Sequence, residues 1–402
     1  MNRTGFTRLL AALALLPMLC SCGGNTSSLS PRNSGLGSGL SPRRPSRTTS
    51  DSTATAAAVP TRIAFVSNEN GHPDVWLMDS DGSHRTGVTN DEAVERSPHW
   101  ADGGRSLVFL RETKDKTELV KHYLPDNADR TLVTLEKERV LQLAAAPVSA
   151  SVAFLVKADD GTSLQVVPLE DAKSRKLMAV PTTASIQSLC WLGDGHTLAL
   201  ALVQKEAQSP AKASAGAPGK ADKAKAKDSK DEEGKAPATG LLLVDAETGR
   251  TRPLTTDVRD RFVVGSRRPG ALAFLRGESL CVFDSVEGDN ATPRRVVDKV
   301  KPLPPVWSPD GTQLAYWVLG DKPVVGVVSA TGGEPRALPL PDDAVPSEGL
   351  TWSPEGTQLG FLKQQGDGDT QRNLFYVVEL SGGKDRRLTE ALADHREVVW
   401  GS

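Results

Sequence analysis

An excess of basic residues is missing from this chain of 402 residues, which has 48 Lys and Arg against 50 Asp and Glu. A protein that binds nucleic acid needs a basic surface to displace counterions from phosphates, so this balance argues against a nucleic-acid partner. Long helical patterns are also missing, whereas Gly and Pro are frequent, at 36 and 27 residues. This combination is typical of many short β-strands joined by turns.

Cysteine is scarce, with four residues in the chain, and none has the CxxC or Cys/His spacing of a metal site. Cys190 and Cys281 lie inside apolar strand patterns. We expect two buried thiols that behave as small apolar side chains, with a disulfide between them as the alternative. The sequence contains no HExxH, GxSxG or Walker phosphate-loop motif, so we expect no catalytic site, no metal and no cofactor.

An apolar run at residues 9–19 follows two arginines and is too short to remain as a membrane-spanning helix. Its length suits a signal peptide. The run ends in Leu19-Cys20-Ser21-Cys22-Gly23, which resembles the lipobox of bacterial lipoproteins. The resemblance implies a signal peptide over 1–21, cleavage before Cys22 and acylation of Cys22. The alternative is an ordinary secretory signal in which the cysteines occur by chance.

Two segments have compositions that favour solvation over a packed core. Residues 22–60 are rich in Ser, Thr, Gly, Pro and Ala, and we expect a flexible tether that begins at the lipidated cysteine. Residues 205–239 are mostly Ala, Lys, Asp, Gly and Pro, which predicts a solvated insertion. Because Gly23 follows Cys22, the lipoprotein resemblance implies sorting to the outer membrane, facing the periplasm, with the inner membrane as the alternative.

The remaining chain, residues 61–402, is built from repeats. Two copies lie 45 residues apart and contain Trp307-Ser308-Pro309-Asp310-Gly311 and Trp352-Ser353-Pro354-Glu355-Gly356. Further copies lie around Trp100 and Trp191, and two degenerate copies lack the Trp. Each copy continues with an aliphatic strand, a strand ending in Asp, a Gly turn and a basic-Leu-Thr strand. Four short strands in each repeat are typical of one blade of a β-propeller.

The tryptophan of each repeat has a large surface that one four-stranded sheet cannot bury alone. Packing against the next repeat encloses this surface and contributes several kcal/mol, at about 25 cal/mol per Å² of buried area. We therefore expect these residues in the core rather than as a platform for a ligand. The predicted repeat-core residues are Trp100, Trp191, Trp307, Trp352 and Trp400.

The number of blades follows from the aliphatic second strand, which recurs around residues 63, 107, 152, 198, 272, 314 and 359. Residues 398–402 form a first strand without its second, and residues 62–67 form a second strand without its first. Pairing the two would complete a seventh blade and leave no free sheet edge. The predicted fold is an all-β, seven-bladed propeller of four-stranded antiparallel blades, or six-bladed if a degenerate repeat is misread.

The Trp-Ser-Pro-Asp-Gly pattern and the strand ending in Met78-Asp79 resemble the repeats of the TolB-like propeller family, also called PD40 or WD40-like repeats. The resemblance covers nearly all of residues 61–402 and implies the propeller fold. The chain departs from TolB itself because it lacks the N-terminal α/β domain and has an extra blade. These departures put a partnership specific to TolB in doubt.

The function expected from these features is that of a non-enzymatic interaction module. We expect a monomeric propeller, held to an envelope membrane by the lipid anchor, whose loops bind an envelope protein or a glycan. The alternative is a propeller enzyme with a metal or quinone site in its central channel, because propellers can build sites from residues on different blades. Neither the partner nor the ligand is specified by the sequence.

Overall fold

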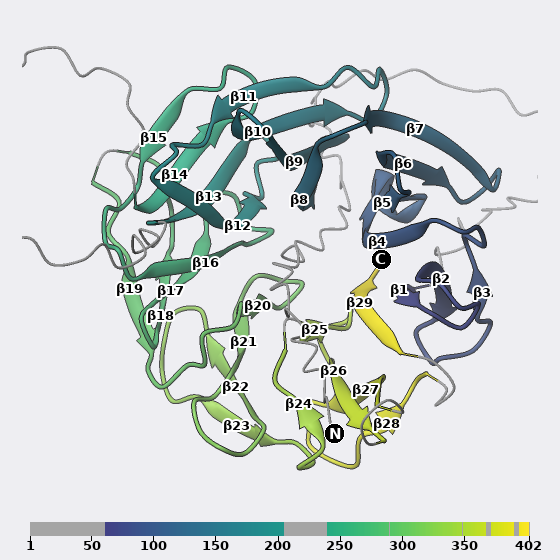
Figure 1. Cartoon of the computed structure of the whole chain (residues 1–402). Helices are drawn as coiled ribbons and strands as arrows, with labels where there is room; N and C mark the ends of the chain where they lie inside the picture. The colour runs from purple at the N-terminus through teal and green to yellow at the C-terminus, as the bar shows by residue number, and fades with distance from the viewer. Residues whose placement is uncertain are drawn as a thin grey trace, which may run out of the picture.

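The computed structural model of the chain describes residues 61–204, 239–288, 290–347, 349–366, 371–389 and 394–401. These residues form seven antiparallel sheets around a common axis, so the predicted seven-bladed propeller is confirmed and the six-bladed alternative is wrong (Figure 1). Within the described residues the only helix is a 3-10 turn, Asp102–Gly104. The predicted lipidation site Cys22, the tether and nearly all of the 205–239 insertion lie outside the described residues.

In blades 1 to 6 the first-named strand lies nearest the axis, and in every blade the last-named strand lies at the rim (Figure 1). Blade 1 contains β29 (His395–Trp400), β1 (Arg62–Ser67), β2 (Asp74–Asp79) and β3 (Thr86–Gly87). Blade 2 contains β4 (Val94–Ala101), β5 (Ser106–Glu112), β6 (Thr117–Tyr123) and β7 (Ala128–Leu135). Blade 3 contains β8 (Arg139–Ala145), β9 (Ser151–Ala158), β10 (Gly161–Pro168) and β11 (Arg175–Ala179). Blade 4 contains β12 (Ala184–Trp191), β13 (Thr197–Gln204), β14 (Gly240–Asp245) and β15 (Thr251–Pro253).

The last three blades follow the same order. Blade 5 contains β16 (Asp260–Gly265), β17 (Leu272–Arg276), β18 (Ser279–Phe283) and β19 (Arg294–Val297). Blade 6 contains β20 (Val306–Trp307), β21 (Gln313–Trp317), β22 (Val324–Ser329) and β23 (Arg336–Pro339). Blade 7 contains β26 (Gln358–Gln365), β27 (Arg372–Glu379) and β28 (Arg386–Arg387), and its inner position is divided between β24 (Ala344–Val345) and β25 (Thr351–Trp352).

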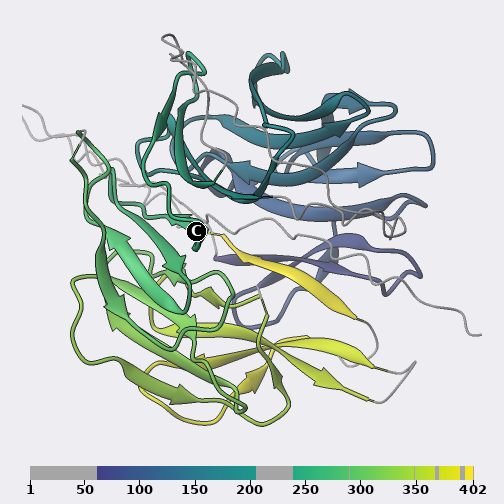
Figure 2. The same cartoon turned by 60° about the vertical axis from the view of Figure 1, so that its left-hand side comes forward.

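The ring is closed by β29 and β1, which come from opposite ends of the described chain. They pair antiparallel, with Ile63 opposite Trp400 and Ala64 opposite Val399. In both views the yellow β29 lies beside the purple β1 (Figure 1, Figure 2). The two strands exchange backbone hydrogen bonds, and β1 therefore has no unpaired edge.

The repeat tryptophans lie between blades, and four of them donate an indole N–H to the preceding blade. The acceptor in each case is a main-chain carbonyl of the preceding inner strand. These bonds run from Trp100 to Val399, from Trp191 to Ala144, from Trp307 to Val264 and from Trp352 to Val306, at 2.9–3.2 Å. Trp191, Trp352 and Trp400 are buried, whereas Trp100 and Trp307 are half-buried. A buried indole needs a hydrogen-bond acceptor, and the neighbouring inner strand supplies it.

The seam between blades 4 and 5 is built differently, because Gly265 replaces the tryptophan of the repeat. A Cβ at Gly265 would collide with the carbonyl oxygen of Trp191, so the two backbones approach closely at this seam. The side chains of Cys190 and Cys281 are buried in the same seam. The two cysteines do not form a disulfide with each other, so that alternative does not hold. Burial also raises the pKa of Cys281, as expected for a thiol in apolar surroundings.

Arginines on the outer strands of four blades bind the next blade. Each guanidinium donates to main-chain carbonyls in the turn between the third and fourth strands of its neighbour. These bonds run from Arg175 to Ala246 and Glu247, from Arg252 to Val286 and Gly288, from Arg294 to Ala330, and from Arg386 to Asp81. The basic residue of the basic-Leu-Thr strand therefore links neighbouring blades at their outer rim.

Closure by β29 can be tested with a buried charge. Val398 is fully buried against Ile63 and Phe65, so Val398→Asp leaves a carboxylate without a partner in this seam. We expect the free energy of unfolding to fall by about 3 kcal/mol, measured by chemical denaturation. Val258→Asp is the control, because Val258 is 61% exposed and should tolerate the charge. Equal stability of the two variants would show that the β29 pairing does not hold the ring.

Candidate functional site

The inner strands of blades 1 to 5 share a β-bulge, seen as a shift in register against the second strand. In three blades the residue three positions before the repeat's Trp position has a positive φ: Glu397 at 50°, Ser97 at 57° and Phe262 at 54°. Non-glycine residues rarely adopt this conformation, which costs of order 1–3 kcal/mol. The bulge is a property of the repeat, whereas a carboxylate at this position is specific to Glu397 in blade 1.

The Glu397 carboxylate crosses the seam between blades 1 and 2. It accepts a hydrogen bond from the backbone N–H of Ser97, the equivalent bulge residue of blade 2. Burial raises the pKa of Glu397 above its usual value, and nearby Glu112 acts in the same direction. The Ser97 N–H and the charges of Arg96 and Arg396 oppose this rise in the pKa. A carboxyl group with a raised pKa beside arginines is a common arrangement in functional sites.

Arg96 extends this group of charges to blade 3. Its guanidinium donates to the Glu112 Oε1 atom at 2.5 Å and to the Val140 carbonyl of β8 at 2.7 Å. Arg96 is therefore held between two blades with its charge close to the Glu397 carboxylate. We call Glu397, Arg96, Arg396 and Glu112 the inner-strand cluster.

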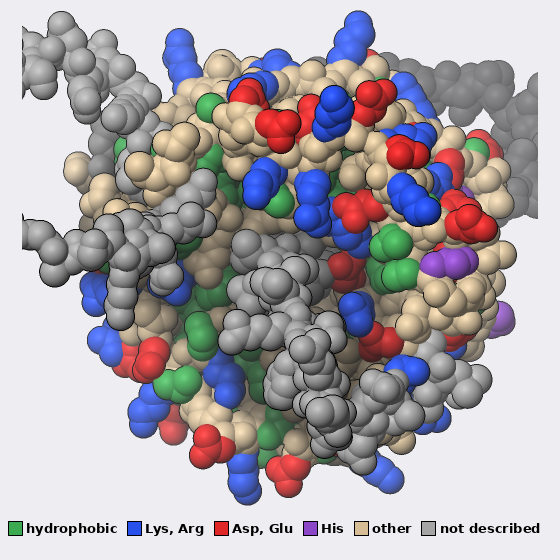
Figure 3. Space-filling model, in the orientation of Figure 1, with side chains coloured by type: hydrophobic (Ala, Val, Ile, Leu, Met, Phe, Trp, Pro, Cys, Tyr) green, Lys and Arg blue, Asp and Glu red, His purple; other side chains and the backbone are tan. Residues whose placement is uncertain are grey.

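A hollow of about 230 Å³ adjoins the inner-strand cluster and shares Glu112 with it. Its walls are the β5–β6 turn, residues 112–117, and the link between blades 2 and 3, residues 136–139. Lys114, Asp115 and Glu136 are among the lining residues, so charges of both signs surround the space. Figure 3 shows acidic and basic side chains interspersed over this upper part of the propeller. Mixed charges and an exposed turn suit a polar ligand such as a peptide or a sugar chain.

A second set of buried charges is explained by the repeat and not by a ligand. A Thr at the end of an outer strand accepts a backbone N–H of its own blade and donates to an acid on the next inner strand. An Arg on the second strand of that next blade then pairs with the same acid. These triplets are Thr89, Glu95 and Arg111 at blades 1 and 2, and Thr255, Asp260 and Arg276 at blades 4 and 5. Because the arrangement occurs twice, we assign it to blade packing.

The structure does not bring the sequence-predicted residues together as a site. The five repeat-core tryptophans lie in the seams between blades, and Cys22 lies outside the described residues. No three His, Cys, Asp or Glu side chains within the described ranges are grouped so that they could hold a metal ion. Sequence reasoning missed Glu397. The available signal was its position three residues before Trp400, where the repeats of Trp100 and Trp191 have Ser97 and Ser188.

Comparison by sequence finds no relative: no protein-family model and no curated protein matches the chain. Comparison by structure finds many. An oligogalacturonate lyase from Vibrio parahaemolyticus matches at 12% identity with a TM-score of 0.54, over 83% of this chain and 85% of that protein. A puromycin-hydrolysing peptidase from Mycobacterium tuberculosis matches at 14% identity with a TM-score of 0.55, over 82% of this chain. This chain spans about half, 53%, of that peptidase.

These matches correct one expectation. The lack of catalytic motifs led us to expect that the chain is not an enzyme, and that inference is wrong, because structures with the same fold include lyases and peptidases. Linear motifs such as GxSxG do not report sites that a propeller assembles from separate blades. At 10–16% identity these likenesses show the fold and not an activity.

TolB proteins are also among the matched structures. TolB from Acinetobacter baumannii matches at 14% identity with a TM-score of 0.46, over 70% of this chain and 64% of that protein. A TolB-like protein from Agrobacterium tumefaciens matches at 12% identity with a TM-score of 0.40, over 83% of this chain and 90% of that one. The fold implied by the resemblance of the repeats is confirmed by the seven blades of the structure itself, and the chain is a seven-bladed β-propeller.

Proposed function

We propose that this chain is a lipid-anchored protein of the bacterial envelope whose propeller binds a protein or glycan partner through the inner-strand cluster and its adjoining hollow. The observation that carries the proposal is Glu397. Its carboxylate is partly buried and next to two arginines, and the other blades have no carboxylate at this position. Burial of a charge destabilises the fold, and proteins keep such a feature mainly where a ligand uses it.

The cluster and the hollow suggest the chemistry of the partner. Arg96 and Arg396 can donate to carbonyl, hydroxyl or carboxylate oxygens, and Glu397 can accept from N–H or O–H groups. Peptides and sugar chains offer both kinds of group. The lipobox at Cys22 supports a membrane anchor, and no helix among the described residues is long and apolar enough to cross a bilayer.

A second candidate function is an enzyme that uses the same cluster, and the raised pKa of Glu397 is the observation that favours it. A carboxyl whose pKa lies nearer to neutral pH is a better general acid or base. Glu397 would exchange a proton with the substrate, while Arg96 would stabilise negative charge that develops on it. Incubation of the purified protein with envelope glycans and peptides would distinguish the two functions. An enzyme would form a product, and its Glu397→Gln variant would not.

The binding face can be tested with a photo-crosslinking residue, p-benzoylphenylalanine, placed in the full chain in cells. Position 114 lines the hollow, and position 173 is an exposed lysine at the opposite end of the strands in blade 3. We expect a defined crosslinked product from position 114 and none from position 173. Arg96→Gln should weaken the product. No product from position 114, or equal products from both positions, would contradict binding at this face.

The proposed anchor has a matched control within the lipobox. Cys22→Ala should abolish incorporation of radiolabelled palmitate and leave the chain uncleaved, because the acylated thiol is gone. Cys20→Ala should be labelled like the unchanged chain, since it leaves Cys22 in place. Labelling that survives Cys22→Ala would show that Cys22 is not the site of acylation.

The raised pKa of Glu397 gives a stability prediction with a definite sign. A glutamate whose pKa is higher in the folded state favours folding when protonated, and this contribution is lost as the pH rises above about 4.3, its usual pKa. Glu397→Gln should therefore raise the free energy of unfolding at pH 7.5, with little effect at pH 4. Chemical denaturation at both pH values measures this.

The control for this measurement is Glu334→Gln, which alters an exposed carboxylate on blade 6 and should change stability at neither pH. Glu397→Gln should at the same time weaken the crosslink from position 114. A gain of stability with a loss of binding is the expected signature of a functional residue. Lower stability at pH 7.5 would instead show that the charged carboxylate is part of the framework.

A further inference from the structure

Arg336 of blade 6 differs from the arginines that link the other blades. It occupies the same register as they do: Val327 is opposite Arg336, as Leu243 is opposite Arg252 and Val377 is opposite Arg386. The four linking arginines bind carbonyls of the next blade, whereas the described residues supply no hydrogen bond or ion pair to Arg336. The carbonyl that would be its counterpart belongs to Leu380 of blade 7.

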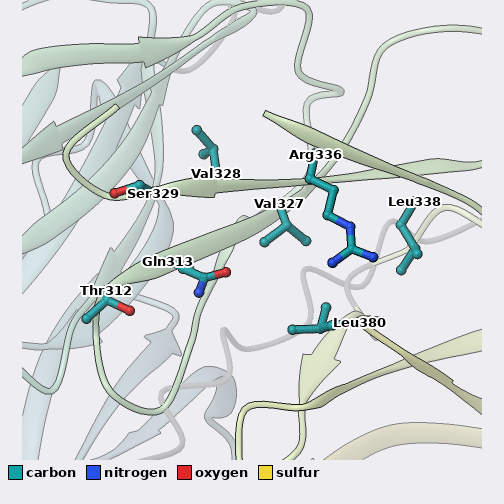
Figure 4. Close-up of a pocket in the computed structure, with 8 residues that line it drawn as sticks. All are labelled: Thr312, Gln313, Val327, Val328, Ser329, Arg336, Leu338 and Leu380. Atoms are coloured by element: carbon teal, nitrogen blue, oxygen red, sulfur yellow. The ribbon is translucent and has the colours of Figure 1, made fainter. Parts of the chain in front are cut away.

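A pocket of about 260 Å³ lies where the missing link would be. In Figure 4 the side chains of Gln313, Val327, Arg336 and Leu338 point into one space, which Leu380 closes from blade 7. Buried apolar side chains fill the inner part of the seam between blades 6 and 7. They do not fill its outer part, where the pocket lies. Arg336 is exposed at the mouth of this space, and its guanidinium faces the apolar Val327 and Leu338 as well as the polar Gln313.

The two nearby acids, Glu379 and Asp310, are hydrogen-bonded to other side chains and form no ion pair with Arg336. Glu379, next to Leu380, accepts a hydrogen bond from the Gln358 side chain at 2.5 Å. Asp310 on the adjacent turn accepts hydrogen bonds from Ser308 and Thr312. The positive charge in the pocket is left to be met by a ligand or by water.

We propose that this pocket binds an aliphatic carboxylate. The carboxylate takes the place that a turn carbonyl has in the other seams, and it receives two parallel hydrogen bonds from the planar guanidinium of Arg336. Val327, Leu338 and Leu380 contact the aliphatic part, and the Gln313 amide can donate to a further oxygen. The volume is below the 300–1,000 Å³ typical of drug-sized ligands, which limits the bound group to about one or two residues.

The site is separate from the inner-strand cluster. Its turns join the first strand to the second and the third to the fourth, at residues 312 and 329. The hollow beside the cluster is instead formed by the β5–β6 turn, between a second and a third strand. Consecutive turns of an antiparallel sheet lie at opposite ends of the strands, so the two sites open at opposite ends of the propeller. The proposal therefore does not depend on the proposed function.

Two sources can supply this chemistry, namely a peptide C-terminus that ends in an aliphatic residue and a free branched acid. We would titrate the full chain, purified in detergent, with acetyl-Ala-Leu carrying a free carboxylate, with the same peptide as its C-terminal amide, and with 4-methylpentanoate. Isothermal titration calorimetry gives the affinities. Dipeptide binding at least about tenfold tighter than that of the acid assigns the site to peptide termini, and equal binding assigns it to free acids.

The amide should bind at least about tenfold more weakly than the free peptide, because it lacks the charge that pairs with Arg336. Arg336→Gln should lower the affinity by a similar factor and leave the melting temperature unchanged, since Arg336 links no blades. Arg252→Gln is the matched control, which should lower the melting temperature and leave the affinity unchanged. Absence of binding at millimolar carboxylate, or equal affinity of Arg336→Gln and the unchanged chain, would overturn the proposal.

Discussion

The propeller depends on hydrogen-bond donors that reach from one blade to the main-chain carbonyls of the next. Near the axis, the indole N–H groups of Trp100, Trp191, Trp307 and Trp352 point to the preceding blade. At the rim, arginines of the outer strands point to the following blade. Apolar contacts alone would hold seven sheets together without fixing their angles, whereas directed bonds to carbonyls at two radii set both spacing and orientation.

Candidate functional residues are best recognised where one blade differs from the pattern that the other blades share. Buried ion pairs do not by themselves mark a site, because the Thr–acid–Arg triplets occur twice and serve blade packing. Glu397 and Arg336 are different. At the same positions in other blades, the residues are explained by the packing of the blades. A carboxylate stands where blade 2 has Ser97, and an arginine without a link stands where four others have one.

The sequence was sufficient for the architecture because the repeat signals are local and periodic. Trp307 and Trp352 with their Gly-containing turns give the period, and the two orphan strands give the closure. The sites could not be found in this way. Glu397 is hydrogen-bonded to Ser97, 300 positions away in the chain, in a seam that only the folded ring creates. The importance of Arg336 depends on the bonds that its counterparts in other blades make. Missing linear motifs also misled the prediction about enzymatic activity.

The pairing of β29 with β1 has a consequence for the order of folding. Blades 2 to 7 contain strands that are consecutive in the chain, so each can form as soon as its own segment is available. Blade 1 must wait for Trp400, the last residue of the final strand. Until that residue has been synthesised, β1 keeps an unpaired edge. The growing protein is in this interval most exposed to chaperones, proteases and pairing with other chains.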